Sequence, residues 1–346
     1  MINKTEQKII DLLEQRGACS SKEIFDDIEI DVSYASIKRI LARLVLENHI
    51  VIEGQGRATK YLISPAYNII KPIDIDNYFE KEIDEREIKT LFEHSIISEL
   101  LSIRSIFTEI EFEKLMTLQS VFEEHIAHLS ESEFRKEFER LSIDLSWKSS
   151  QIEGNTYSLL ETEILLKEKE TAAGKSKEEA VMLLNHKEAI DFILENPDYL
   201  SPLTVSKIED IHAILTKELD VERNLRKRRV GITGTNYLPL DNEFQILEAL
   251  QNTCELVNER ENVFEKALIS LILISYIQPF ADGNKRTARI VSNAVLMSKK
   301  YCPLSFRTVD AIDYKKAMLL FYEQNNISAI KKIFIDQYEF AVNTYF

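Results

Sequence analysis

The sequence predicts a mostly α-helical protein, and three observations support this. Only 8 glycines and 7 prolines occur among 346 residues, so helix-breaking residues are scarce. Leu, Ile, Glu and Lys are abundant, and apolar residues recur at helical spacing over long stretches. With 45% hydrophobic residues the chain can bury a core, and its length favours two domains or one large domain with an appendage.

Helical segments are expected from the start of the chain. Residues 4–16 have helical periodicity and end at Gly17, a residue type that favours the C-terminal end of a helix. Ser20 or Ser21 can cap a second, short helix, and a longer amphipathic helix follows Ser33. Three short helices are therefore expected in succession.

Residues 50–64 contain two β-rich pieces around Gly54-Gln55-Gly56, which predicts a β-hairpin. Three helices followed by a hairpin resemble a winged helix-turn-helix domain, and the helix after Ser33 would be its recognition helix. The candidates for a DNA-binding face are Ser36, Lys38, Arg39, Arg43 and Arg57.

The charge balance limits the DNA-binding interpretation. A formal net charge of -15 argues against a protein that covers nucleic acid or an anionic membrane with its whole surface. Acidic neighbours such as Asp26 and Asp27 also weaken the basic stripe that DNA binding needs. Winged helices serve as protein-docking or dimerisation modules too, so DNA contact, protein docking and homo-oligomer formation all stay open.

A linker is expected after the hairpin, at residues 65–89, between a domain at 1–64 and a second domain at 90–346. Amphipathic helices are expected from about residue 84 to residue 194, with a break near 171–180. The stretch "RVGITGTNYLPL", residues 229–240, is β-like and predicts a small β-hairpin that stands out from the helical body.

The cellular location that we expect is the cytoplasm. No secretion signal begins the chain, and the longest apolar run, residues 267–277, is too short to span a bilayer. The three cysteines are far apart in the sequence, as is usual for reduced thiols in a cytosol. No membrane partner is therefore expected.

A cation-rich turn, "IQPFADGNKRTARI", separates two apolar helical segments near the C-terminus. Backbone N–H groups at a helix start are free donors, and the helix dipole is positive there, so phosphate is the expected ligand. Gly283 allows close backbone approach, and Asn284 can orient the loop. Lys285 and Arg286 supply positive charge, while Asp282 can hold a divalent cation that bridges phosphates.

At these residues the chain resembles the Fic family, whose loop is His-Pro-Phe-x-Asp/Glu-Gly-Asn-Gly/Lys-Arg-x-x-Arg and which transfers AMP from ATP to protein hydroxyl groups. The matching residues are Pro279, Phe280, Asp282, Gly283, Asn284, Lys285, Arg286 and Arg289. Ser149, Glu153 and Gly154 resemble the family's autoinhibitory helix, expected near residues 145–160. Residues 229–240 resemble its target-binding flap, with Gly231, Ile232, Thr233, Gly234 and Tyr237 as candidates.

The resemblance implies that ATP and Mg²⁺ bind here and that a target protein, or the protein itself, supplies the hydroxyl group. Asp282 would coordinate Mg²⁺ and Asn284 with the loop amides would hold the α-phosphate, while Arg286 and Arg289 would neutralise the β- and γ-phosphates. Glu153, on reaching Arg289, would take this arginine away from the γ-phosphate. The flap would pair through its backbone with an extended target segment.

The first residue of the loop departs from the family pattern. Gln278 stands where the family has the histidine that takes the proton from the attacking hydroxyl group. A neutral amide cannot accept that proton, and general-base assistance is worth about 10²- to 10⁴-fold in rate, so slow or absent transfer is expected. A natural pseudoenzyme, an altered reaction and an engineered substitution all stay open.

Lys285 also leaves open whether AMP or phosphate is the group transferred. The lysine variant of the loop occurs in relatives that bind the nucleotide in inverted orientation and transfer phosphate. Gly283, Glu153 and Arg289 favour the AMP-type orientation.

The combined expectation is a Fic-type protein adenylyltransferase that is autoinhibited by Glu153 and weak or inactive because of Gln278. The alternative is a nucleotide-sensing, DNA-binding regulator whose Fic-like half is only an ATP or ADP receptor. A protein-docking module that binds neither ligand is the third hypothesis.

Overall fold

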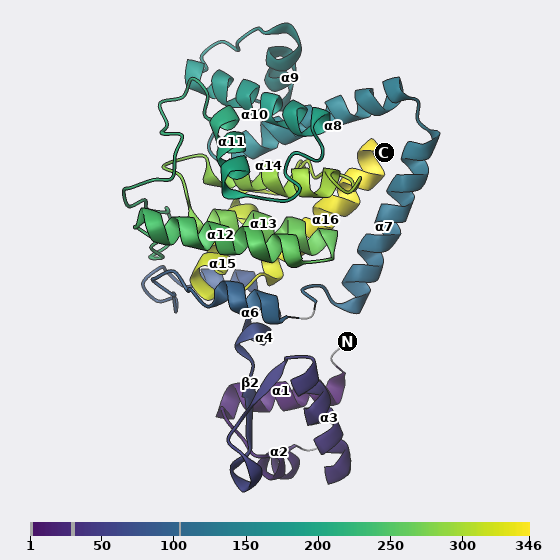
Figure 1. Cartoon of the computed structure of the whole chain (residues 1–346), viewed down its shortest axis with the longest axis vertical. Helices are drawn as coiled ribbons and strands as arrows, with labels where there is room; N and C mark the ends of the chain where they lie inside the picture. Colours follow the sequence, from purple (N-terminus) through teal and green to yellow (C-terminus); the bar gives the residue numbers. More distant parts are fainter. Residues whose placement is uncertain (1–2, 29–31, 104) are drawn as a thin grey trace.

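Three helices and a two-stranded sheet form the N-terminal part of the computed structural model, which describes residues 3–28, 32–103 and 105–346 (Figure 1). These elements are α1 (Lys4–Arg16), α2 (Ser21–Asp27), α3 (Tyr34–Leu46), β1 (Ile50–Glu53) and β2 (Lys60–Ile63). The strands are antiparallel, with Ile50 opposite Ile63, and a 3-10 turn, Gly56–Ala58, lies between them. The three predicted helices and the predicted hairpin are all present.

Side-chain caps set the helix ends in this part. Ser20 and Glu23 form a capping box at the start of α2, so two backbone N–H groups that lack helical partners are satisfied. Ser33 caps α3, and α1 ends at Gly17, which has a φ of 76°. The apolar faces of these elements form their own hydrophobic core, which includes Ile9, Ile10, Leu13, Ile24, Ile37, Leu41, Leu44 and Ile50.

The segment predicted as a linker contains two short helices, α4 (Pro65–Ile70) and α5 (Ile75–Glu80). Pro65 lies in the first turn of α4, where its missing N–H group costs no helical hydrogen bond. Tyr67 packs in the N-terminal core, whereas Ala66 and Ile69 pack in the larger core that follows. Tertiary packing on both sides, which no local pattern shows, accounts for the helix at this position.

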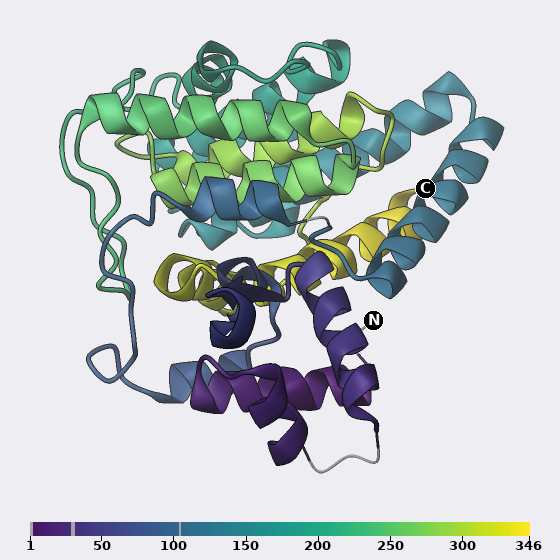
Figure 2. The ribbon, with the colours of Figure 1, turned by 60° about the horizontal axis from the view of Figure 1, so that its bottom comes forward.

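The larger part of the chain is a helical body built around α13 (Figures 1 and 2). Its helices are α6 (Ile96–Ser102), α7 (Glu109–His128), α8 (Glu131–Ile152), α9 (Leu159–Glu168), α10 (Lys177–Glu195), α11 (Val205–Leu215), α12 (Glu243–Glu259), α13 (Val263–Ile277), α14 (Asn284–Met297), α15 (Ala311–Gln324) and α16 (Ser328–Tyr345). Helix resumes at Ile96, later than the expected residue 84, and the predicted break falls between α9 and α10.

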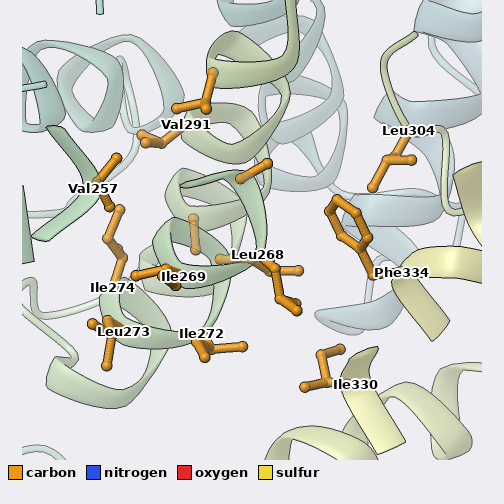
Figure 3. Close-up of a cluster of buried hydrophobic side chains, with 14 of the residues drawn as sticks. Val257, Leu268, Ile269, Ile272, Leu273, Ile274, Val291, Leu304, Ile330 and Phe334 are labelled. Carbon is orange, nitrogen blue, oxygen red and sulfur yellow. The ribbon is translucent and has the colours of Figure 1, made fainter. Parts of the chain in front are cut away.

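The apolar run of residues 267–277, which lies within α13, is the centre of this core. All residues from Ala267 to Ile277 are buried, as expected for a helix that is surrounded by others. Figure 3 shows Leu268, Ile269, Ile272, Leu273 and Ile274 of α13 among side chains of neighbouring elements, labelled Val257, Val291, Leu304, Ile330 and Phe334. This packing fixes the end of α13, and with it the start of the cation-rich turn.

Residues 229–240 do not form the predicted β-hairpin. They turn at Gly234, which has a φ of 90°, but the two arms form no ladder within the described part of the chain. The Leu238 N–H group instead donates to Thr90 O at 2.9 Å, in a parallel bridge between Leu91 and Leu238. Partners far away in the sequence have taken the backbone groups that a hairpin would use. We keep the name flap for residues 229–240.

A membrane-spanning helix was not expected from the sequence. Over residues 3–28, 32–103 and 105–346, no helix has both the length and the apolar character that crossing a bilayer requires.

Candidate functional site

Two residues in left-handed conformation close the turn between α13 and α14. α13 ends at Gln278, with a φ of 51°, and Gly283, with a φ of 80°, precedes the first residue of α14. A Cβ atom at Gly283 would also lie 3.4 Å from the side chains of His212 and Thr216. No side chain of the described residues caps α14, so the N–H groups of its first turn are available to a ligand.

Asn284 holds this turn together. Its Oδ1 accepts from the Phe280 N–H group at 2.8 Å, and its Nδ2 donates to Phe280 O at 2.8 Å and to Gln278 Oε1 at 3.0 Å. Gln278 Nε2 in turn donates to Ser275 O at 2.6 Å. The Asn284 side chain therefore orients the loop, and the donors left for an anion at this point are backbone N–H groups.

The three predicted cations at the start of α14 lie at different depths. The side chains of Lys285, Arg286 and Arg289 are 22%, 2% and 0% exposed. Arg286 Nη2 donates to Asp282 Oδ2 at 2.9 Å, while its Nε and Nη1 have no partner among the described residues. A buried guanidinium group with unused donors is well suited to an anionic ligand.

Glu153 reaches α14 from the C-terminal end of α8. Its Oε1 accepts from Arg289 Nη2 at 2.9 Å, and its Oε2 lies 3.5 Å from Lys285 Nζ. Ser149 accepts from Arg289 twice, at 2.8 Å through Oγ and at 2.8 Å through its backbone oxygen. Gly154, with a φ of 102°, then turns the chain away. The predicted inhibitory residues and the second arginine are thus in direct contact.

The charge state of Glu153 follows from these neighbours. Burial raises the pKa of its carboxyl group, but Arg289 and Lys285 lower the pKa by more, so it lies below its ordinary value. Glu153 is therefore ionised near neutral pH and holds Arg289 against α8.

His186, from α10, completes this contact. Its side chain is buried, and its Nε2 lies 2.6 Å from Ser149 Oγ. Arg289 Nε donates to the same Ser149 hydroxyl oxygen, so this hydroxyl group joins α10 to α14. Burial, with the charges of Arg289 and Arg286, holds the pKa of His186 well below its ordinary value, so the ring is neutral.

A second buried histidine contacts the turn through a ring stack and a hydrogen bond. The ring of His212, from α11, stacks on Phe280 with centroids 3.7 Å apart and an interplanar angle of 5°. Its Nε2 donates to the backbone oxygen of Asp282 at 3.0 Å, since a carbonyl oxygen only accepts. Burial lowers the pKa of His212 to about 4. Neither histidine was predicted, because no spacing in the sequence links them to the turn.

A cavity of about 350 Å³ opens over the turn, a volume in the range of small-molecule sites. Its wall combines Ile152, Glu153, Val230, Gly231, Ile232, Thr233, Gln278, Ala281, Asp282, Gly283, Asn284, Lys285, Arg286, Tyr314, Lys315, Met318, Leu319 and Tyr322. Glu153 is part of this wall, whereas Arg289 is not. The contribution of α15 was missed, because its apolar residues follow the same pattern as core residues.

The flap residues divide into two groups. Gly231, Ile232 and Thr233 line the cavity. Tyr237 is 1% exposed, stacks on Tyr276 with centroids 4.8 Å apart, and donates its hydroxyl proton to Tyr276 O at 3.0 Å. The Tyr237 side chain is therefore buried in this structure, where it anchors the flap, and its contact with a target stays a prediction.

Asp282 is the predicted magnesium ligand, and its side chain is 67% exposed beside the cavity. No group of three or more His, Cys, Asp or Glu side chains within the described ranges could hold a metal ion. Mg²⁺ is commonly bound by one or two carboxylates together with substrate phosphates, so Asp282 fits a metal ion that arrives with a nucleotide.

The turn and the helices that support it belong to a stretch with known relatives. Residues 202–296 match the Fic/DOC family. This Fic region contains α11 to α13, the turn, and α14 as far as residue 296. His212 and the cation-rich turn therefore lie inside it, whereas Glu153 and His186 lie before it.

Named relatives match a longer stretch of the chain. A protein adenylyltransferase Fic from Nematostella vectensis is 30% identical over 174 residues, which are 49% of this chain and 40% of that protein. A protein adenylyltransferase fic-1 from Caenorhabditis briggsae is 26% identical over 236 residues, which are 64% of this chain and 46% of that protein. The chain spans less than half the length of these curated relatives.

Solved structures of Fic proteins share the fold. Fic-1 from C. elegans superposes with a TM-score of 0.59 at 20% identity, over 68% of this chain and 72% of that one. A Fic family protein from Desulfovibrio desulfuricans gives a TM-score of 0.57 at 17% identity, over 68% and 74% of the two chains. The helical body around α13 therefore has the Fic fold.

The predicted DNA-binding residues lie outside the Fic region, four of them on α3 and Arg57 in the 3-10 turn between β1 and β2. Lys38 and Arg39 are exposed, with Lys38 over the Tyr34 ring, and Arg39 donates to the half-buried Ser36. Arg43 instead pairs with the buried carboxylate of Glu6. The Arg57 side chain lies outside the described residues. The described basic side chains thus form a smaller face than predicted.

Proposed function

We propose that this protein binds ATP with Mg²⁺ at the turn between α13 and α14, in a site of the protein adenylyltransferase type. The observation that supports this most directly is the cation-lined cavity at an uncapped helix start, inside the stretch that matches the Fic/DOC family. The relatives that match the chain are named protein adenylyltransferases, which supports AMP transfer as the reaction class.

The cavity suits a nucleotide triphosphate chemically. Phosphates would accept from the N–H groups of the first turn of α14 and from Arg286, whose Nε and Nη1 are unused in the described structure. Ile232, Met318 and Leu319 add apolar wall area, which suits a base. Asp282 would hold Mg²⁺, which neutralises phosphate charge when bound.

The acceptor would be a hydroxyl group of a protein segment that pairs with the flap. Residues 231–233 border the cavity, so an extended segment beside them would place a side chain near the phosphates. The group that faces it at the loop start is Gln278, whose amide is hydrogen-bonded to Asn284 and Ser275. This amide cannot take the hydroxyl proton, and without general-base assistance transfer should be slower by about 10²- to 10⁴-fold.

Glu153 would inhibit the site by holding Arg289. Arg289 donates to Glu153 and twice to Ser149, and it does not line the cavity. A γ-phosphate would have to compete with these bonds and would also meet the negative charge of Glu153. The contacts of Arg289 and Lys285 with this carboxylate support the orientation for AMP transfer over the inverted orientation for phosphate transfer.

The test is a comparison of this chain with Gln278→His and Gln278→Ala, by ATP·Mg²⁺ calorimetry and labelled-ATP transfer. All three should bind ATP, and only Gln278→His should label protein above the level of the unchanged chain, because Gln278→Ala disturbs the turn but adds no base. Strong labelling by the unchanged chain would refute the role assigned to Gln278. Absence of ATP binding in all three would refute the proposed site.

A second candidate is a nucleotide-sensing regulator that binds DNA through a winged helix-turn-helix domain, residues 1–64. The observation that favours it is the exposed pair Lys38 and Arg39 on the predicted recognition helix. Duplex binding that weakens with salt and is lost in Lys38→Ala/Arg39→Ala would support it. Duplex binding that survives this double change would oppose it.

A further inference from the structure

Arg86 joins the segment between α5 and α6 to the flap. In Figure 2 this segment, in blue, runs beside the green loops of residues 220–240. Arg86 Nη2 donates to Gly234 O at 3.1 Å, and the Leu238 N–H group donates to Thr90 O at 2.9 Å. The flap is thus hydrogen-bonded to the segment between α5 and α6, which connects the N-terminal part to the helical body.

A buried carboxylate fixes the position of Arg86. Glu323 of α15 is 0% exposed, and both of its oxygens lie 3.2 Å from Arg86 Nη1. The Tyr78 hydroxyl group donates to Glu323 Oε2 at 2.7 Å. A buried carboxyl group needs hydrogen-bond partners, and Arg86 and Tyr78 supply them, so Glu323 holds the Arg86 side chain in place.

The shape of the guanidinium group explains why the same side chain also reaches the flap. One nitrogen of Arg86 binds Glu323 while another donates to Gly234 O, and the group lies over the Phe79 ring at 4.9 Å. A planar fork can serve two fixed acceptors at once, whereas an ammonium group is a single point charge. A lysine could keep the ion pair but would not hold both partners.

The Gly234 carbonyl group lies at the turn of the flap, next to the part that borders the cavity. A Cβ atom at Gly234 would lie 3.5 Å from Leu319 Cδ1, and both Leu319 and Thr233 line the cavity. The turn is therefore confined between Arg86 on one side and the α15 wall of the cavity on the other.

We propose that Arg86 is a positioning residue for the reaction, which holds the flap turn over the cavity through the Gly234 carbonyl group while Glu323 holds Arg86. The proposal rests on the proposed function, in which the flap presents the acceptor. Its consequence is that the connection to the N-terminal part sets the geometry of acceptor binding, although it contributes no residue to the cavity.

The test uses the full chain and two variants that keep their side chains similar in size. Arg86→Lys keeps the charge beside Glu323 but loses the fork, and Glu323→Gln keeps Arg86 but removes the charge that fixes it. The control is Asp76→Asn, which removes an exposed ion pair between α5 and Lys316 and does not touch the flap. The chain has 8 glycines, so carbonyl-¹³C glycine labelling gives few signals, and Gly234→Ala identifies the one from Gly234.

Both test variants should move the Gly234 carbonyl signal upfield, and they should speed amide exchange of residues 231–238 about tenfold, as expected for loss of one charge-assisted hydrogen bond. Exchange in α13 and α14 should stay as in the unchanged chain, and Asp76→Asn should alter neither readout. An unmoved Gly234 signal, or equal acceleration in α13 and α14, overturns the proposal. Neither readout requires transfer, so a failed labelling assay would count against the proposed function alone.

Discussion

Glu153→Gln is the substitution that tests the inhibitory contact most directly. The amide keeps the size of the side chain but removes the charge that lies 2.9 Å from Arg289 Nη2 and 3.5 Å from Lys285 Nζ. A hydrogen bond to a charged group contributes about 1.5–3 kcal/mol, and Arg289 keeps its two bonds to Ser149. Because the Glu153 side chain is 20% exposed, we expect a loss of about 1–2 kcal/mol in unfolding free energy.

The same change should strengthen nucleotide binding. Release of Arg289 and removal of a negative charge from the cavity wall should tighten ATP·Mg²⁺ binding by about tenfold, which corresponds to about 1.4 kcal/mol. Calorimetry and urea unfolding of the two proteins measure both effects. Glu188→Gln is the matched control, because Glu188 is half exposed and pairs with Lys217 at the surface.

Acidification gives a further check on the stability difference. The folded-state pKa of Glu153 lies below its ordinary value, so its contribution is present above about pH 4.5 and is lost as the pH falls through the folded pKa. The difference in unfolding free energy between the unchanged chain and Glu153→Gln should therefore shrink below pH 4.5. If Glu153→Gln binds ATP no more tightly than the control, the inhibitory role is refuted.

Three further outcomes are expected. His186→Leu removes the hydrogen-bond partner of the buried Ser149 hydroxyl group and should cost about 1–3 kcal/mol in urea unfolding, part of which His186→Gln should restore; equal losses would contradict a stabilising hydrogen bond at this position. The pKa of His212 is about 4 in the folded state, so unfolding free energy should fall by about 1.4 kcal/mol per pH unit from pH 6.5 towards pH 4 on its account, and His212→Gln should show a shallower pH dependence. Leu273→Ala in the centre of the core should cost about 2–5 kcal/mol in the same assay, and a loss below 1 kcal/mol would place this side chain outside the tight packing of Figure 3.

Local signals in the sequence predicted most of the fold. Gly17, Ser20 and Ser33 define helix ends through contacts within a few residues, and the structure confirms the helices that they bound. The apolar run of residues 267–277 predicted an apolar helical segment, which is α13. Such features depend on neighbours in the chain, which a sequence displays directly.

Features that depend on distant partners were not predicted. Tyr237 is fixed by Tyr276, and residues 65–70 are helical because two separate cores cover them, so neither the burial of Tyr237 nor α4 has a local signature. For the site, the turn and Glu153 were found by their motifs, whereas His186 and His212 are isolated histidines in unrelated helices. Only the folded chain shows that the first binds Ser149 and the second stacks on Phe280.

Helix α4 limits how the protein can be divided into fragments. The Asn326 amide donates to the backbone oxygens of Asn68 and Lys71, both at 2.8 Å, and the Ile327 N–H group donates to Ile69 O at 2.8 Å. A cut after residue 64 would remove Tyr67 from the core of the smaller piece. A cut after residue 71 would leave the larger piece without the acceptors of these three hydrogen bonds. We therefore expect cleavage within α4 to destabilise both parts, because the helix that joins them is packed in both cores.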